Sequence, residues 1–168
     1  MHSRIFCLVS KNETEEEKEK IRENFKDLTE DDLYEQFQCK GFDYCNEDTD
    51  LRDDWEWLGQ NKMCETYEED GKFFVRFNKD RIKEYVEDKL ERLKAKVDEL
   101  SMETFNEWVI YDIQNIMNDE HSFWFLIDEQ YNDYSFDSFM LSRCRAMHEG
   151  NDDFQLDFEV VKSVDYHF

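Results

Sequence analysis

The chain contains no proline and only four glycines among its 168 residues. With glycine this scarce, the sequence holds no phosphate-binding P-loop, no glycine-rich dinucleotide turn and no Gly-x-Ser-x-Gly nucleophile motif. It also has no internal repeat, no linker and no low-complexity tract. Carboxylate pairs indicate little, because among so many acidic residues some lie close together by chance. We therefore expect a protein that is not an enzyme and has no catalytic residues.

Histidine and cysteine are too few and too scattered to predict a metal site. The five cysteines are irregularly spaced without a Cys-x-x-Cys, and the four histidines lie far apart in the sequence. Asn46, Asp48 and Asp50 imitate the start of a calcium loop. That loop, however, needs glycine where Leu51 stands and glutamate where Trp57 stands. We expect no metal, no cofactor, and reduced cysteines that mostly pack in the core.

Long apolar runs are missing as well. No stretch approaches the roughly 18 apolar residues of a membrane-spanning helix. Residues 1–10 are too short and too polar for a signal peptide. These absences predict a cytoplasmic protein without membrane contact. The negative net charge disfavours direct binding of nucleic acid or anionic lipid and favours a basic protein as partner.

Acidic side chains are what the sequence has in excess: 44 aspartates and glutamates against 21 lysines and arginines, a net charge of −23. Residues 1–78 hold 11 basic and 22 acidic side chains, residues 79–100 hold 7 of each, and residues 101–168 hold 3 and 15. The two acidic parts also carry most of the aromatic residues, so they are not disordered acidic tails. The length suits a single domain with its own core.

Residues 78–118 show the clearest periodic pattern. Between residues 79 and 100, apolar side chains recur three and four positions apart, which predicts an amphipathic helix. Ser101 breaks the register and is a suitable N-cap for a second helix, whose apolar face starts at Met102 and Phe105 and continues through Trp108 to Met117. Two helices with almost no loop between them need a sharp corner. We expect a helix pair at the centre of the fold with both apolar faces buried.

The rest of the chain alternates between strand and helix patterns. Strands are predicted at residues 4–10, 63–67, 72–77, 122–128 and 154–168. Helices are predicted at residues 14–27, from residue 29, and at 51–58 and 136–147. Together these elements predict one α+β domain over residues 1–168. Its sheet would be mainly antiparallel, with the central amphipathic helix pair packed on it and helices on one face.

Two groups of residues are candidate partner-binding surfaces. The first is spaced by four residues, so a helix would place its carboxylates along one ridge at steps of about 6 Å: Glu15, Glu19, Glu23 and Asp27. The second mixes acidic with aromatic side chains: Tyr44, Asp48, Asp50, Asp53, Asp54, Trp55 and Glu56. Proteins that bind duplex DNA use grooves of Lys and Arg to match about one charge per 1.7 Å of its axis. Carboxylates on a helix can occupy such a groove as a nucleic-acid mimic, with aromatic residues as anchors.

Other interpretations of these residues stay open at this stage. Lys18, Arg22 and Lys26 form a basic ridge beside the acidic one, so residues 15–27 are equally compatible with a solvated helix that has internal ion pairs. An acidic surface can also serve solubility alone. The alternative function is a non-enzymatic adaptor or antitoxin-like protein-binding module that uses an apolar patch. An uncovered sheet edge would also allow two copies to pair as a homodimer.

Three segments of the chain carry a resemblance to other proteins. They are Met1-His-Ser-Arg-Ile-Phe6, the amphipathic segment with Trp108 after Ser101, and Val164-Asp-Tyr-His-Phe168. In these segments the chain resembles small acidic proteins carried on mobile elements of Gram-positive bacteria. Genes on such elements, phages included, often encode inhibitors of host defence. The resemblance implies an anti-CRISPR or anti-restriction inhibitor whose partner is a CRISPR effector or a restriction enzyme.

Overall fold

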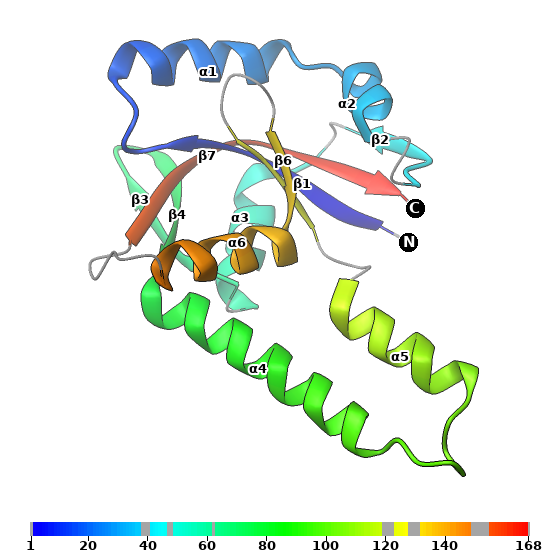
Figure 1. Ribbon diagram of the computed structural model, residues 1–168. Coiled ribbons are helices and arrows are strands. Elements are labelled where there is room, and N and C mark those ends of the chain that lie inside the picture. The colour runs from blue at the N-terminus through cyan, green and yellow to red at the C-terminus, as the bar shows by residue number, and fades with distance from the viewer. Residues whose placement is uncertain are drawn as a thin grey trace.

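The computed structural model describes residues 2–37, 41–46, 49–61, 63–118, 123–127, 132–148 and 155–167. These residues form a seven-stranded sheet with helices packed on it (Figure 1), which confirms the α+β class. The strands are β1 (His2–Ser10), β2 (Tyr44–Asn46), β3 (Glu65–Glu69), β4 (Lys72–Asn78), β5 (Trp124–Ile127), β6 (Asn132–Ser135) and β7 (Gln155–His167). The helices are α1 (Glu15–Asp27), α2 (Glu30–Phe37), α3 (Leu51–Gln60), α4 (Lys79–Asp98), α5 (Glu107–Asn118) and α6 (Phe136–His148).

Strand β7 is the axis of the sheet. It pairs antiparallel with β1 on one side and with both β4 and the short β2 on the other. The order across the sheet is β3-β4-β7-β1-β5-β6. Among the described strands, β1 and β5 are the one parallel pair, so the sheet is mainly antiparallel as predicted. The last described strand therefore holds the first strand and the β3–β4 hairpin together.

Helices cover both faces of the sheet, whereas the sequence suggested one covered face. Strand β1 explains the difference. Its residues Ile5 and Cys7 point into the core under α1 and α2, while Phe6 and Leu8 point into the core next to α3 and α6. All four side chains are fully buried. A strand whose successive residues are all apolar has no solvent face, so each side of the sheet needs its own helical layer.

The α4–α5 pair joins the rest of the fold near the start of α4 and through α6. Ile82 of α4 reaches the core. Lys89 is buried against the Asp137 carboxylate of α6 and donates a hydrogen bond to the Met117 carbonyl of α5 (3.0 Å). No described side chain of α5 is fully buried. The expectation that both apolar faces would be buried is therefore wrong, and in Figure 1 the pair extends away from α1 and α2.

The second helix of this pair begins six residues later than the predicted cap. Ser101 caps only a turn, in which its hydroxyl accepts hydrogen bonds from the Glu103 and Thr104 amides (3.2 Å each). Asn106 accepts hydrogen bonds from the two amides at the start of α5 (3.0 and 3.2 Å) and is the N-cap of that helix. The turn between the helices carries Met102, whose side chain is 98% exposed.

Candidate functional site

Helix α1 displays acidic residues on its outer side. Its start is fixed by a capping box in which Thr14 and Glu17 satisfy each other's backbone amides (2.9 and 3.3 Å). Ile21 and Phe25 bury the opposite edge of the helix against the sheet. The four carboxylates of the predicted ridge are all exposed: Glu15, Glu19, Glu23 and Asp27.

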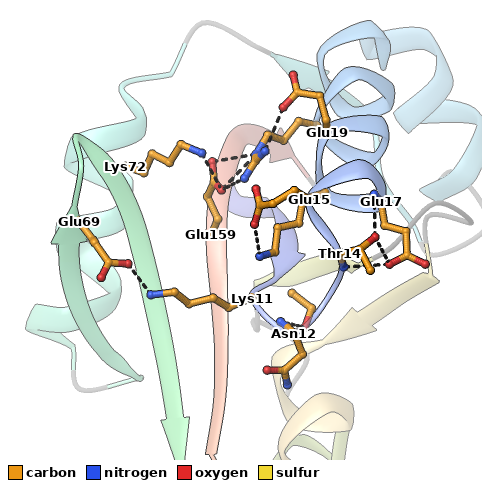
Figure 2. A network of polar contacts seen from close by, with 12 residues as sticks. Lys11, Asn12, Thr14, Glu15, Glu17, Glu19, Glu69, Lys72 and Glu159 are labelled. Atoms are coloured by element: carbon orange, nitrogen blue, oxygen red, sulfur yellow. Dashed lines mark hydrogen bonds and ion pairs between the residues drawn. The ribbon is translucent and has the colours of Figure 1, made fainter.

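Two of the four basic residues of α1 turn inward. The side chains of Lys18 and Arg22 are only 13% and 12% exposed. Arg22 binds Glu159 of β7 with 2.6 Å between Nη2 and Oε2, and this carboxylate raises the pKa of the guanidinium. In this network, which Figure 2 shows, Glu159 also accepts a hydrogen bond from Lys72, and Arg22 also donates to Glu19. Arg22 thus binds the sheet and Lys18 lies largely buried beside Glu15, so the outer side of the helix keeps an excess of carboxylates.

Part of the ridge forms ion pairs within the protein. Glu15 contacts Lys18 (2.7 Å), and Glu19 contacts Arg22 (3.0 Å). The hydrogen bond from Lys18 lowers the pKa of Glu15, so this carboxylate is ionised at neutral pH. The first two positions of the ridge are therefore partly neutralised. Both interpretations of residues 15–27, the acidic ridge and the internally paired helix, describe part of the structure.

Helix α2 extends the acidic surface, which the sequence analysis missed. Leu33 and Phe37 bury the inner face of this helix. The carboxylates of its outer face are exposed: Glu30, Asp31, Asp32 and Glu35. A signal was available, because the four-residue spacing of the ridge continues from Asp27 to Asp31 and Glu35. We call the exposed carboxylates of α1 and α2 the acidic layer. Residues 13–37 contain 11 acidic and 4 basic side chains.

A hollow of about 510 Å³ lies where α1 meets α2. Among the described residues, three carboxylates and three neutral polar or apolar side chains line it: Asn24, Asp27, Leu28, Asp32, Glu35 and Gln36. Hydrogen bonds from the Thr29 hydroxyl and amide (2.6 and 2.9 Å) lower the pKa of Asp32 and keep it ionised. The chemistry of this lining suits a lysine or arginine side chain of a partner protein.

The second predicted group, at residues 44–56, does not form one surface. Arg4 binds the buried carboxylate of Asp54 through Nε (2.7 Å). The buried indole of Trp55 donates a hydrogen bond to the Phe74 carbonyl (2.9 Å). Asp50 is the N-cap of α3 and accepts hydrogen bonds from two amides of that helix. The prediction that Asp54 and Trp55 contact a partner is therefore wrong, because both side chains are buried. Asp50 has a structural role as a helix cap.

Helical spacing explains why Asp54 is buried. Leu51, Trp55 and Leu58 share the inner face of α3. Asp54 lies three residues after Leu51 and four before Leu58, so it lies on the same face. A carboxylate at such a position needs a cation, which Arg4 of β1 supplies. The same spacing is visible in the sequence and would have excluded Asp54 from the surface.

Of the remaining members, Asp53 and Glu56 lie apart from the acidic layer, whereas Tyr44 is on β2, which packs against α2. Asp53 and Glu56 are exposed on α3. That helix packs on the opposite face of the sheet from α1 and α2. Tyr44 is 45% exposed and stacks on His167, with ring centroids 5.3 Å apart. Asp48 lies outside the described residues.

The buried thiols are poor nucleophiles. Burial, with the nearby Glu30 carboxylate adding to it, raises the pKa of Cys45 to about 11. Burial likewise raises the pKa of Cys64 to about 12. Both thiols are therefore protonated at neutral pH. Within the described ranges, no three His, Cys, Asp or Glu side chains are arranged to hold a metal ion.

Comparison with protein-family models, with curated proteins and with solved structures finds no match for this chain. In the part of the chain that the structure describes, no helix combines the length and the apolar character needed to cross a lipid bilayer. Inference about function therefore starts from the chain's own residues, chiefly the acidic layer.

Proposed function

We propose that this protein is a non-enzymatic inhibitor that binds a basic nucleic-acid-handling protein and occupies the groove in which that protein holds nucleic acid. One observation carries the proposal. On α1, Lys18 and Arg22 turn toward the sheet while the carboxylates stay outside. Helix α2 then continues the carboxylates beyond α1, so one side of the molecule presents acid from two helices.

Electrostatics favour a basic partner over any other class. A net charge of −23 produces a negative potential that attracts basic surfaces and repels nucleic acid. Carboxylates along one helical ridge are about 6 Å apart, which is sparser than the phosphates of duplex DNA at about one charge per 1.7 Å. The second helix extends this row of carboxylates beyond α1. The proposed mechanism is competition, in which carboxylates of the acidic layer take the places of phosphates.

A host-defence enzyme is the proposed target. The resemblance of three segments to proteins of Gram-positive mobile elements supports an anti-restriction or anti-CRISPR role, because phages and similar elements survive by blocking such nucleases. Inhibition of this kind would take place in the cytoplasm, where the nucleases meet invading DNA. The hollow between α1 and α2 adds a place for one basic side chain of the target.

The exposed apolar side chains of the α4–α5 pair support a second candidate, the adaptor or antitoxin-like module. Phe105 and Trp108 are 64% and 71% exposed there. Binding through apolar contacts depends weakly on salt, whereas binding through the acidic layer weakens as salt screens the charges. Salt dependence therefore separates the two candidates.

An affinity pull-down tests the proposal. The tagged full chain is incubated with a bacterial lysate that contains restriction and CRISPR enzymes, and then washed at about 0.1 M and about 1 M salt. The proposal predicts retention of one basic nuclease that the high-salt wash, or an excess of that nuclease's own DNA or guide RNA, releases. Retention of a protein that does not handle nucleic acid, through the high-salt wash, would favour the adaptor instead.

A further inference from the structure

Exposed apolar side chains concentrate on the α4–α5 pair. Of twelve large apolar side chains that are exposed in the described part of the chain, eight belong to this pair and its turn: Leu90, Val97, Met102, Phe105, Trp108, Ile110, Tyr111 and Met117. Exposed apolar surface of this kind marks interaction sites. The pair is attached to the domain by α6 and by the start of α4, which leaves its far end uncovered.

Two contacts fix the register of the two helices. Lys89 of α4 donates a hydrogen bond to the Met117 carbonyl of α5 (3.0 Å), and Lys96 of α4 contacts the Asp112 carboxylate of α5 (3.3 Å). In this antiparallel register Leu90 lies at the level of Met117. Two helical turns further along the pair, Val97 lies at the level of Ile110.

These four side chains share one broad side of the pair. Leu90 and Val97 each follow a lysine that faces α5, so they are rotated from the contact line by about 100°. Ile110 and Met117 follow Val109 and Ile116, which flank Asp112 on the face toward α4 and are half-buried. In an antiparallel pair, equal rotations turn side chains to the same side. Residues 86, 90, 93 and 97 are spaced by four, three and four, which is the spacing of a helix that packs in a bundle.

Charge indicates what covers this side. Residues 79–118 contain 7 basic and 10 acidic side chains, a net charge of −3, so the other 128 residues carry −20 of the total of −23. A basic partner is attracted more strongly to the acidic layer than to this nearly neutral pair. Two copies of the chain therefore repel each other less through this pair than through the rest of the chain. Helix α4, with 7 charges of each sign between residues 79 and 100, can also form ion pairs with a second copy of itself.

The available area fits a stable dimer. Leu90, Val97, Ile110 and Met117 are 40–53% exposed, and Met102 and Phe105 of the adjoining turn are 98% and 64% exposed. The six side chains together offer on the order of 700 Å² per copy, about half of it from the turn, against roughly 600 to 1,000 Å² from each partner in a standard interface. Two helical pairs packed by their broad sides make a four-helix bundle, a common arrangement for a two-fold interface.

We propose that two copies of this chain associate through the broad side of the α4–α5 pair, defined by Leu90, Val97, Ile110 and Met117, to form a four-helix bundle. The proposal is independent of what the acidic layer binds. Because α1 and α2 lie across the sheet from this pair (Figure 1), the dimer keeps both acidic layers accessible. Two linked layers would bind a target with two basic sites more tightly than either layer alone.

Sedimentation velocity of the full chain over about 1 to 100 μM tests the proposal. A dimer has about twice the 20.7 kDa mass of one chain. The combined variant Val97→Glu, Ile110→Glu should weaken the dimer at least about 100-fold, because charged groups cannot be buried unpaired in the bundle. The control variant Tyr34→Glu, Leu141→Glu makes the same two changes at positions that are each 40% exposed elsewhere. It should leave the dimer unchanged.

Three results would overturn the proposal. They are a wild-type chain that stays monomeric at the highest concentration, a dimer that survives in the folded Val97→Glu, Ile110→Glu variant, and a dimer that the control variant also abolishes. Circular dichroism establishes whether each variant folds. Hydrogen exchange of the wild-type chain at low and high concentration gives a test that needs no variant. Amides of residues 90–97 and 110–117 should exchange more slowly at high concentration, and unchanged rates there would contradict the bundle.

Discussion

Arg22 of α1 and Glu159 of β7, 137 residues apart in the chain, form a two-point contact in which Nε and Nη2 of the guanidinium approach one carboxylate oxygen (3.1 and 2.6 Å). The two side chains are only 12% and 11% exposed. Together with the buried Ile21 and Phe25, this contact fixes which side of α1 faces the sheet. It therefore also determines which carboxylates of α1 face solvent and belong to the acidic layer.

Replacing Arg22 with glutamine should lower the unfolding free energy by about 2 to 4 kcal/mol, because the buried Glu159 carboxylate loses its main partner. Lys72, 3.5 Å from Glu159, compensates only in part. Urea denaturation at neutral pH measures the loss. Lys26→Gln, an exposed change on the same helix, should cost less than about 0.5 kcal/mol, and adding Glu159→Gln to Arg22→Gln should restore most of the stability. Equal effects of Arg22→Gln and Lys26→Gln would show that the contact does not hold α1.

Asp157 of β7 provides a prediction about pH. Burial acts to raise its pKa, but two hydrogen bonds from Arg76 (2.7 and 3.1 Å) outweigh burial and hold the pKa below the ordinary 3.8. A carboxylate with a lowered pKa contributes stability above its unfolded pKa and loses it as the pH falls through the folded value. Asp157→Asn should therefore cost about 1 kcal/mol at pH 6, and the difference from the wild type should shrink as the pH falls below about 4.

Urea denaturation of the wild type and of Asp157→Asn, from about pH 6 to below about pH 4, measures the difference between their unfolding free energies. Taking the difference removes the general effect of acid on a chain rich in carboxylates, because both proteins share it. In an Arg76→Gln background the same Asp157→Asn change should show no comparable dependence on pH. A difference that stayed constant down to pH 2 would argue against the Arg76 contact as its source.

Lys89 should be the residue that attaches α5. Its ammonium contacts the Asp137 carboxylate, which also accepts a hydrogen bond from the Tyr85 hydroxyl (2.9 Å). Lys89→Met leaves Asp137 buried without a cation and should cost about 3 kcal/mol. Hydrogen exchange should become faster along α5, since the bond to the Met117 carbonyl is lost too. The double change Lys89→Met, Asp137→Leu should recover global stability but not the protection of α5. Unchanged exchange in Lys89→Met would refute this attachment.

Asn106, rather than Ser101, should control the start of α5. Asn106→Ala removes the acceptor for two amides of the first turn and should cost about 1 kcal/mol. Faster hydrogen exchange is expected at residues 108–110, next to the cap. Ser101→Ala should affect only the turn that precedes the helix. If Ser101→Ala frayed α5 as much as Asn106→Ala, the later start of the helix would be wrong.

Much of the fold could be predicted from local patterns. The pattern of residues 4–10 indicated a strand, and the helices predicted at residues 14–27 and from residue 79 begin in the structure within one residue of the predicted positions. Local patterns do not show which distant residue meets a side chain. Glu159 lies 137 residues from Arg22, so its role in turning that cation inward could not be deduced from residues 15–27 alone.

Burial was the less predictable property. An amphipathic stripe shows that a helix has an apolar face, but it does not show whether the same domain covers it. The faces of residues 82–100 and 102–117 looked like core and are half open in the structure. In contrast, the inward position of Asp54 follows from its spacing to Leu51 and Leu58, and the α2 carboxylates follow from continuing the spacing of the ridge. Both features could have been predicted from the sequence.

The most direct test of the acidic layer compares two variants that each remove three exposed carboxylates from one helix. One carries the changes Glu19→Gln, Glu23→Gln and Asp27→Asn on α1, and the other Glu87→Gln, Glu91→Gln and Asp98→Asn on α4. Each is used in the same pull-down at about 0.1 M salt. We predict that the α1 variant retains at least about ten-fold less of the basic nuclease, while the α4 variant retains as much as the wild type. Equal retention by both variants, or an equal loss from both, would contradict binding through the acidic layer.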